Sequence, residues 1–290
     1  MTRLLLALLW LLHWLPLPLL AALGRGLGRL LWWLAGERRR IALRNLSLCF
    51  PTWTDAQRAA LASEHFGWLG RSLLERGLLW HASPARLRRL IVIEGPASFA
   101  DTHPGPLMWL APHFMALDVA GAAIQLFVAR PGCSIYQAQS DRVFDAALKR
   151  ARLRFGNAKI FARNETAKPL MRAIKEGMGF FNLPDMDFGA KDAAFVPFFG
   201  VPAATLLAPS RMARLLGMKV QPVIAEMLPG GRGYRVRFFE PLDGFPSADA
   251  EADARRMNRW IEERIREHPA QYLWVHKRFK TRPPGEPKLY

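Results

Sequence analysis

One histidine in this chain stands where general-base chemistry is often found. His113 follows an apolar run, Leu107–Ala111, which we predict to be a strand, and it precedes an apolar stretch predicted to be a helix. The turn from a strand into a helix is where α/β proteins present ligands. His113 can accept a proton near neutral pH, and Asp118 in the same stretch can bond the other ring nitrogen and stabilise the imidazolium. The same pattern also suits a loop histidine followed by a carboxylate at a helix N-terminus.

A serine hydrolase would use such a histidine, but the chain lacks the motif for one. There is no Gly-x-Ser-x-Gly sequence, and Ser210 lies in Ala-Pro-Ser-Arg without the glycines. A protein nucleophile is therefore unsupported. If His113 is a base, the nucleophile is a hydroxyl group of the substrate.

Two carboxylates follow a second predicted strand, Gly179–Leu183. Asp185 and Asp187 flank a single residue, so they could bind a divalent ion or orient a substrate hydroxyl. Carboxylates are equally common in turns bounded by Pro and Gly, as these are. No third ligand stands at metal-site spacing, so we expect neither a metal nor another cofactor.

Basic side chains form a third candidate site. Arg163, Arg172 and Lys175 precede the second strand, and the segment 276–282, which includes Arg278, is rich in Lys and Arg. Basic clusters with aromatic neighbours suit phosphorylated lipid headgroups and also nucleic-acid backbones. The apolar N-terminal segment favours lipid, so no nucleic-acid partner is expected.

The composition describes a folded, basic and apolar chain. It has 290 residues, 41 Lys and Arg against 24 Asp and Glu, a net charge of +17 and 51% hydrophobic residues. The 10 Trp and 18 Phe exclude a disordered basic tail. Cys49 and Cys133 lie far apart and form no cluster, so neither a disulfide framework nor a zinc site is indicated, and a reducing compartment is favoured.

The helices and strands predicted around these side chains indicate an α/β fold. The apolar spacing over Asp55–His81 predicts an amphipathic helix. After Pro84, short apolar runs alternate with helical stretches, and a final helix is predicted over Ala250–Glu267. This alternation predicts a single mixed, largely parallel sheet flanked by helices.

The first 35 residues are predicted to form a membrane anchor helix, and residues 36–290 a catalytic domain. Leu4–Leu23 carries no formal charge, and as a helix it would extend roughly 30 Å, enough to cross a hydrocarbon core. Pro16 and Pro18 keep a shallow insertion open; a cleaved signal peptide and a buried hairpin are further alternatives. Several arginines follow the apolar run. Because positive charges flank a membrane segment on its cytoplasmic side, the rest of the chain is expected in the cytoplasm.

Several segments resemble the late acyltransferases of lipid A biosynthesis, within the lysophospholipid acyltransferase superfamily. The H-x4-D box at 113–118 is shared across that superfamily, whereas the C-terminal signature at 271–283 is highly specific. The resemblance runs from about residue 38 to residue 290. The segments that carry it are Arg39–Pro51, Ala111–Asp118, Leu183–Gly189, Phe195–Val201 and Gln271–Pro283.

The resemblance implies an enzyme of the cell inner membrane whose catalytic domain faces the cytoplasm. It would transfer a fatty acyl chain from acyl carrier protein to a hydroxyl on a hydroxyacyl chain of a lipid A precursor. His113 would deprotonate that hydroxyl, with Asp118 orienting and charging the imidazole. The residues implied to shape the site or hold the headgroup are Arg163, Asp185, Asp187 and Arg278.

Two positions depart from the pattern of that family. Asp118 stands where many members have Glu, and Phe188 stands where many have Tyr. The second change removes a hydroxyl, so a hydrogen bond made by that Tyr does not carry over. Two other functions remain open: an acyltransferase acting on another glycolipid or lysophospholipid acceptor, and a non-catalytic basic protein that binds anionic membrane surfaces.

Overall fold

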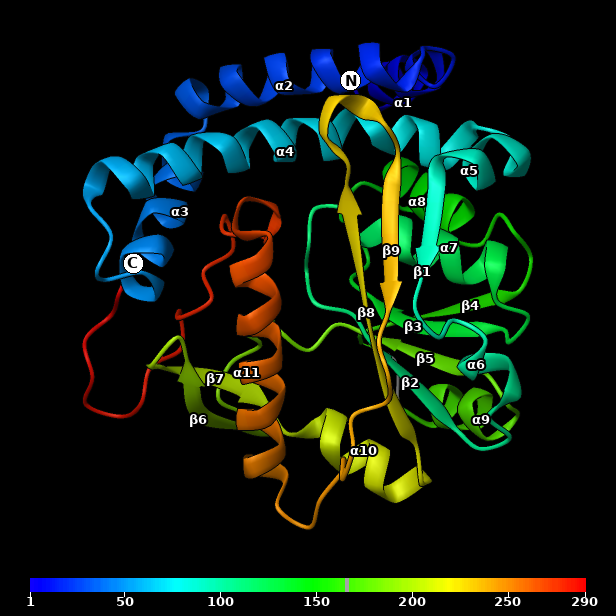
Figure 1. Cartoon of the computed structure of the whole chain (residues 1–290), viewed down its shortest axis with the longest axis vertical. Helices are drawn as coiled ribbons and strands as arrows, with labels where there is room; N and C mark the ends of the chain where they lie inside the picture. Colours follow the sequence, from blue (N-terminus) through cyan, green and yellow to red (C-terminus); the bar gives the residue numbers. More distant parts are fainter. Residues whose placement is uncertain (165–166) are drawn as a thin grey trace.

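A computed structural model describes residues 1–164 and 167–290, which fold around a seven-stranded sheet (Figure 1). The strand order is β1-β9-β8-β2-β5-β3-β4, and all neighbouring pairs are parallel except β8 and β9. The predicted mixed, largely parallel sheet is confirmed. Its strands are β1 (Ile91–Glu94), β2 (Leu107–Leu110), β3 (Gly132–Tyr136), β4 (Ala158–Ala162), β5 (Gly179–Asn182), β8 (Lys219–Met227) and β9 (Tyr234–Phe238).

Helices cover both faces of this sheet, which is why its central strand is apolar at every position. Leu107 and Trp109 of β2 pack into one core with α7, whereas Met108 and Leu110 pack into the other core with α9. A strand buried on both faces reads as a continuous apolar run. The helices are α3 (Gly36–Cys49), α4 (Asp55–His81), α5 (Pro84–Leu90), α6 (Phe99–Thr102), α7 (Leu117–Phe127), α8 (Arg142–Arg152), α9 (Lys168–Lys175), α10 (Ala208–Leu216) and α11 (Ala250–Glu267), with short 3-10 turns at Pro229–Gly231 and Pro269–Gln271.

The prediction of a single sheet needs one correction. Strands β6 (Ala193–Phe198) and β7 (Val201–Leu206) form a separate antiparallel hairpin beside α11. Its two-residue turn, Phe199-Gly200, has positive φ at both residues, as the tight hairpin turns that match strand twist require. The hairpin brings Phe198 into the second core, against Phe279 of the C-terminal segment.

The predicted anchor helix is wrong as a single helix. Residues 1–35 form α1 (Thr2–Leu12) and α2 (Leu17–Leu34), separated by a turn that ends at Pro16. Proline lacks the N–H that would continue α1 and disfavours helical backbone at Leu15 before it, whereas Pro18 lies in the first turn of α2, where proline is tolerated. Within the described residues, no helix combines the length and the apolar character needed to cross a bilayer.

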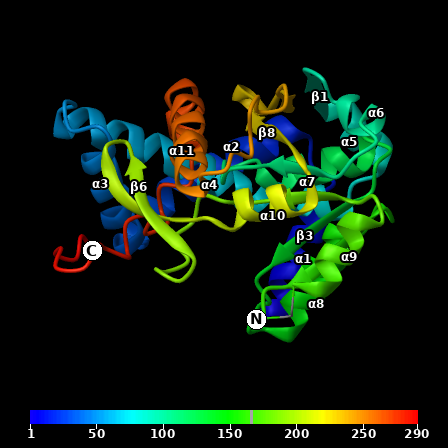
Figure 2. The same ribbon diagram turned by 90° about the horizontal axis from the view of Figure 1, so that it is seen from below.

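Both N-terminal helices pack along α4, and the N-terminus lies beside α8 (Figures 1 and 2). Glycines bring α2 and α4 into close contact: a Cβ added at Gly28 would lie 2.1 Å from the Phe66 carbonyl oxygen, and one added at Gly70 would lie 2.2 Å from that of Gly24. Leu17 and Leu20 of α2 are buried in the same core as β2 and α7. The two helices are therefore part of the folded body.

We predict that Gly28→Ala lowers the free energy of unfolding by about 1–3 kcal/mol, because the added methyl group forces α2 away from the α4 backbone. Chemical denaturation measures the change. Gly26→Ala is the matched control in the same helix, since a Cβ there has no neighbour within 4 Å. Equal stability of the two variants would contradict close packing of α2 on α4.

Candidate active site

His113 is held by a buried carboxylate from a different loop. Its ring nitrogen Nδ1 lies 2.7 Å from Oδ1 of Asp185, and its backbone N–H donates to Oδ2 of the same carboxylate at 2.8 Å. Asp185 is 2% exposed. Because a carboxylate only accepts, Nδ1 carries the proton and Nε2 is the nitrogen with the lone pair. Among the described residues, Nε2 has no hydrogen-bond partner.

The register of two parallel strands brings these residues together. β2 and β5 are neighbours in the sheet, and Leu110 at the end of β2 lies opposite Asn182 at the end of β5. His113 and Asp185 each stand three residues beyond that pair. The carboxyl ends of parallel strands lie at one edge of the sheet, so equal offsets place the two side chains side by side.

The pKa of Asp185 reflects its partners. Burial raises the pKa of this carboxyl, but the charge of His113, the two hydrogen bonds from His113 and the charge of Arg278 together lower it below the ordinary value. The carboxylate is thus ionised at neutral pH and stabilises a positive charge on His113.

Asp118 occupies a different position from the one expected of it. Its carboxylate accepts a hydrogen bond from Arg152 at 3.0 Å and lies 3.6 Å from a guanidinium nitrogen of Arg76. Burial raises the pKa of Asp118, and the two arginines more than offset this. The contact with the His113 ring that we expected of Asp118 is made by Asp185. Asp118 remains close enough for its charge to interact with His113.

The second aspartate of the loop, Asp187, joins that loop to the C-terminal segment. Its carboxylate accepts from the backbone N–H and the hydroxyl of Thr281 at 2.6 and 2.7 Å, and from the N–H of Gly189 at 2.9 Å. The N–H of Asp187 donates to Nε2 of His276 at 3.1 Å. The loop after β5 is therefore fixed from both sides.

His276 and Asn45 complete the wall behind His113. The Asn45 amide donates at 2.7 Å to the carbonyls of Trp274 and His276, and its oxygen accepts from Tyr290. Burial lowers the pKa of His276 to about 4, so this ring is neutral at physiological pH. Neither Asn45 nor His276 was predicted as a site residue. His276 lies in the predicted basic cluster, and both residues lie in segments that carry the family resemblance, Arg39–Pro51 and Gln271–Pro283.

The two arginines among the predicted site residues differ in exposure. Arg278 is 3% exposed and donates to the carbonyl of Ala204 at 2.8 Å and to the hydroxyl of Thr205 at 3.0 Å, so it holds the β7 strand. Arg163 is exposed, and its guanidinium lies 4.4 Å from the centre of the Phe188 ring. Phe188 thus supports Arg163 through a cation–π contact that needs no hydroxyl.

The carboxylates of the Asp185–Asp187 loop are used in hydrogen bonds with the chain. In the part of the chain that the structure describes, no cluster of three or more His, Cys, Asp or Glu side chains is suited to a metal ion. The site offers instead a histidine with a free lone pair and a set of fixed donors. This arrangement can remove a proton from a hydroxyl group.

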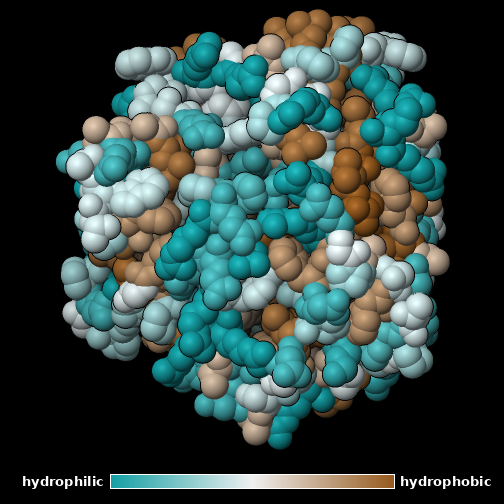
Figure 3. Space-filling model, viewed as in Figure 1, coloured by the Kyte–Doolittle hydropathy of each residue, from teal (hydrophilic) through white to brown (hydrophobic). Residues whose placement is uncertain are grey.

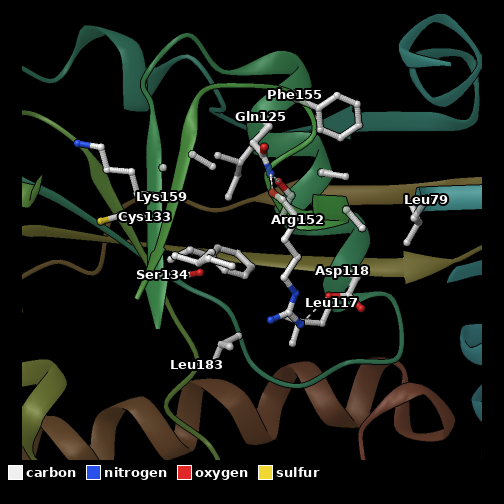
Figure 4. A pocket seen from close by; sticks show the side chains of 18 of the residues that line it. Leu79, Leu117, Asp118, Gln125, Cys133, Ser134, Arg152, Phe155, Lys159 and Leu183 are labelled. Atoms are coloured by element: carbon white, nitrogen blue, oxygen red, sulfur yellow. Dashed lines mark hydrogen bonds and ion pairs between the residues drawn. The ribbon is translucent and has the colours of Figure 1, made fainter. Parts of the chain in front are cut away.

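A largely apolar pocket lies next to the Asp118–Arg152 pair (Figure 4). It is a cavity of about 90 Å³ between α7, the end of α8 and strands β3 and β4, and we call it the α7–α8 pocket. Figure 4 shows Arg152 reaching across it to Asp118. Its apolar lining includes Leu117, Ile124, Phe155, Ile160, Phe181 and Leu183.

The buried histidines predict a loss of stability in acid. Burial lowers the pKa of His276, and likewise that of His65, from 6.5 to about 4. Below pH 6.5 the unfolded chain therefore binds protons that the folded chain does not, and the free energy of unfolding falls until the pH reaches the folded pKa. Each histidine should contribute a loss of about 2 kcal/mol between pH 7 and pH 5. Urea denaturation at both pH values measures it.

The variant His276→Gln keeps an acceptor for the Asp187 N–H but does not titrate. Between pH 7 and pH 5 the free energy of unfolding of this variant should fall less than that of the unmodified protein. The difference should equal the contribution of one histidine. An unchanged pH dependence would show that His276 does not remain neutral in the folded protein.

The chain is similar to known proteins along nearly its whole length. The family model for bacterial lipid A biosynthesis acyltransferases matches residues 1–281. The chain is 33% identical over 285 residues to the lipid A biosynthesis lauroyltransferase of Escherichia coli, covering 97% of this chain and 92% of that protein. It is also 33% identical to the palmitoleoyltransferase of that organism (98% and 92% covered) and 32% identical to its myristoyltransferase (94% and 83%). With this match along nearly its whole length, the chain belongs to the bacterial lipid A biosynthesis acyltransferase family.

Proposed function

We propose that this protein transfers a fatty acyl chain from acyl carrier protein to a hydroxyl on a hydroxyacyl chain of a lipid A precursor. The observation that carries the proposal is the His113–Asp185 pair, which leaves Nε2 of a half-buried histidine ready to accept a proton at the edge of the sheet. Membership of the family supports lipid A as the acceptor. The donor and the residue roles are our proposal.

His113 carries both proton transfers of the proposed reaction, and Asp185 assists it. The oxygen of the acceptor hydroxyl attacks the carbonyl carbon of the thioester and forms a C–O bond, while Nε2 of His113 takes the hydroxyl proton. The tetrahedral intermediate then collapses, the C–S bond breaks, and the imidazolium returns the proton to the departing sulfur. The products are an ester and a free thiol. Asp185 holds the ring in the required tautomer and stabilises the imidazolium between the two steps.

Other charged residues receive separate roles. Arg163 is an exposed cation against Phe188 of the loop after β5, and a guanidinium suits a phosphate of the acceptor headgroup. Asp187 and Arg278 position the wall of the site through their bonds to Thr281 and to β7. Asp118 positions Arg152 and Arg76 beside the α7–α8 pocket.

Residues 1–35 attach the enzyme to the anionic cytoplasmic face of the inner membrane, and residues 36–290 carry the site. The outward face of α1 and α2 is strongly apolar: Leu4 is 76% exposed, Leu11 59% and Trp33 74%. Figure 3 shows hydrophobic side chains gathered at this edge of the molecule. Arg25 and Arg29 are exposed on the same helix, α2. An apolar face with basic residues at its margin is typical of helices that lie in the plane of an anionic membrane.

We predict that Asp185→Asn lowers kcat for acyl transfer by about 10²–10⁴, because an amide at this position no longer stabilises the protonated ring. His113→Ala should reduce transfer to background. Transfer from an acyl carrier protein thioester to a purified lipid A precursor, followed by mass spectrometry, measures both. Because Asp185 acts through His113, its loss should appear in kcat and in the pH profile more than in KM.

Asp118→Asn is the matched comparison, since it removes one carboxylate charge from the same neighbourhood. Its effect on kcat should be the smaller of the two, because Asp118 makes no contact with the ring. A large loss for Asp118→Asn together with a mild one for Asp185→Asn would return the orienting role to Asp118. Normal turnover of His113→Ala would remove the proposed base.

We predict that replacing Leu11 and Leu23 together by Glu weakens binding to vesicles that contain phosphatidylglycerol by at least about tenfold, since two leucines are lost from the lipid-facing surface. Co-sedimentation measures the bound fraction. Leu215→Glu is the control, because Leu215 is 70% exposed on α10, at the opposite end of the molecule in Figure 1. Unchanged binding of the double variant would place the membrane contact elsewhere.

A further inference from the structure

A small hollow lies beside His113, on the side of the C-terminal segment. It has a volume of about 10 Å³, and its lining includes His113, Asp185 and His276. A cavity of roughly this volume holds one water molecule, so the hollow has room for a single oxygen atom of a ligand. A reacting oxygen placed there would touch both the catalytic pair and the His276 ring.

The His276 ring is held in one tautomer. The backbone N–H of Asp187 donates to its Nε2 at 3.1 Å, so Nε2 carries the lone pair. Because burial lowers the pKa of His276 to about 4, the ring is neutral at pH 7 and its proton sits on Nδ1. Within residues 1–164 and 167–290 Nδ1 makes no hydrogen bond, and it is not enclosed as Nε2 of His65 is. One oriented N–H is thus left for a ligand.

The other side-chain donors around the hollow are used within the chain or buried. Asn45 donates both amide hydrogens to backbone carbonyls, and Nε1 of Trp274 donates to another at 2.6 Å. The Tyr272 hydroxyl interacts with the catalytic carboxylate. Arg278 directs its terminal nitrogens to β7, and its Nε is buried. Of the described side chains that line the hollow, His276 therefore offers the available N–H.

We propose that Nδ1–H of His276 donates a hydrogen bond to the carbonyl oxygen of the thioester and stabilises the negative charge that this oxygen gains in the tetrahedral intermediate. The inference rests on the proposed function and adds a second catalytic histidine to it. As the C–O bond forms, one electron pair of the C=O bond moves onto the oxygen, and it returns when the C–S bond breaks. His276 keeps its proton throughout. A donor that is fixed before the reaction stabilises such an oxygen without having to reorient.

The carbonyl oxygen fits this donor better than the acceptor hydroxyl does. The hydroxyl must give its proton to Nε2 of His113, so it needs an acceptor, and Nδ1 of His276 in this tautomer is a donor. The carbonyl oxygen only accepts, and it accepts more strongly as its charge develops. The buried charge of Arg278 opposes protonation of His276 and favours a negative charge in the same neighbourhood.

The test compares His276→Met with His276→Gln, two side chains of similar length that each keep an acceptor for the Asp187 N–H. Only the glutamine has an N–H to donate. His276→Met should lower kcat for acyl transfer by about 10²–10³, the effect of removing one such donor from an active site. His276→Gln should recover part of this loss. KM for the thioester and for the precursor should change little, because the hydrogen bond strengthens only as the intermediate forms.

Thr281→Val is the control for a purely structural role. It removes the hydroxyl that donates to Asp187 at 2.7 Å and leaves His276 in place. Its loss of kcat should be much smaller than that of His276→Met. A thioether analogue of the acyl carrier protein donor, which lacks the carbonyl oxygen, should bind His276→Met and the unmodified protein with the same Kd.

The outcomes separate this inference from the proposed function. Absence of product from the unmodified protein with every thioester would overturn the transfer reaction and this inference with it. Near-normal kcat of folded His276→Met, equal losses for the Met and Gln variants, or an equal loss for Thr281→Val would overturn the role of His276 alone. A higher KM for the precursor with unchanged kcat would assign the N–H to the acceptor hydroxyl and overturn it as well.

A measurement without turnover tests the tautomer on which the inference depends. In ¹⁵N NMR spectra of protein labelled at histidine, the signals that disappear in His276→Gln belong to this ring. They should show a protonated Nδ1 and an unprotonated Nε2 at pH 7. A protonated Nε2 would refute the inference.

Discussion

The pairing of β2 with β5 is the constraint on which the site depends. In a parallel pair the residues that follow the two strands leave the same edge of the sheet, and here the register places Leu110 opposite Asn182. Asp185 accepts both the backbone N–H and the ring N–H of His113, so a single carboxylate fixes the position of the loop and the orientation of the imidazole. A buried carboxylate is costly unless it is paired and hydrogen-bonded, and His113 supplies two of the hydrogen bonds that this one accepts. The need to satisfy Asp185 therefore keeps the histidine in one geometry.

The remaining supports of the site come from distant parts of the chain. Asp187 binds Thr281, Asn45 binds the carbonyls of Trp274 and His276, and Arg278 binds β7. Each is a buried or half-buried polar group whose partner lies in another segment. Hydrogen bonds in such surroundings are stronger than in water, and leaving one partner unpaired is costly. The C-terminal signature thus links the loop after β5 to strand β7.

Much of the fold could be predicted because it depends on local pattern. The helix over Asp55–His81 was predicted with the bounds that α4 has, since its apolar spacing and its Thr54 cap act within the helix itself. The pairing of His113 could not be predicted in this way. β3 and β4 separate β2 from β5 in the sequence, and spacing along the chain favoured Asp118. The helical start of α7 instead directs Asp118 toward Arg152 and Arg76, which lie on α8 and α4. The prolines in the sequence indicated a break near Pro16. That the two resulting helices lie on the folded body depends on the packing of α1 and α2 against α4.

The distances along the chain between contacting residues also indicate the order in which the molecule forms. α2 packs on α4, and both are complete by residue 81. The site closes only when Asn45 meets Trp274, 229 residues later, and when Asp187 meets Thr281. Contacts between distant segments form late because the intervening chain must first be ordered, and synthesis delivers the N-terminal part first. During translation α1, α2 and α4 are therefore synthesised well before the segment that holds the loops around His113, and we expect these three helices to begin packing before His113 acquires its final geometry.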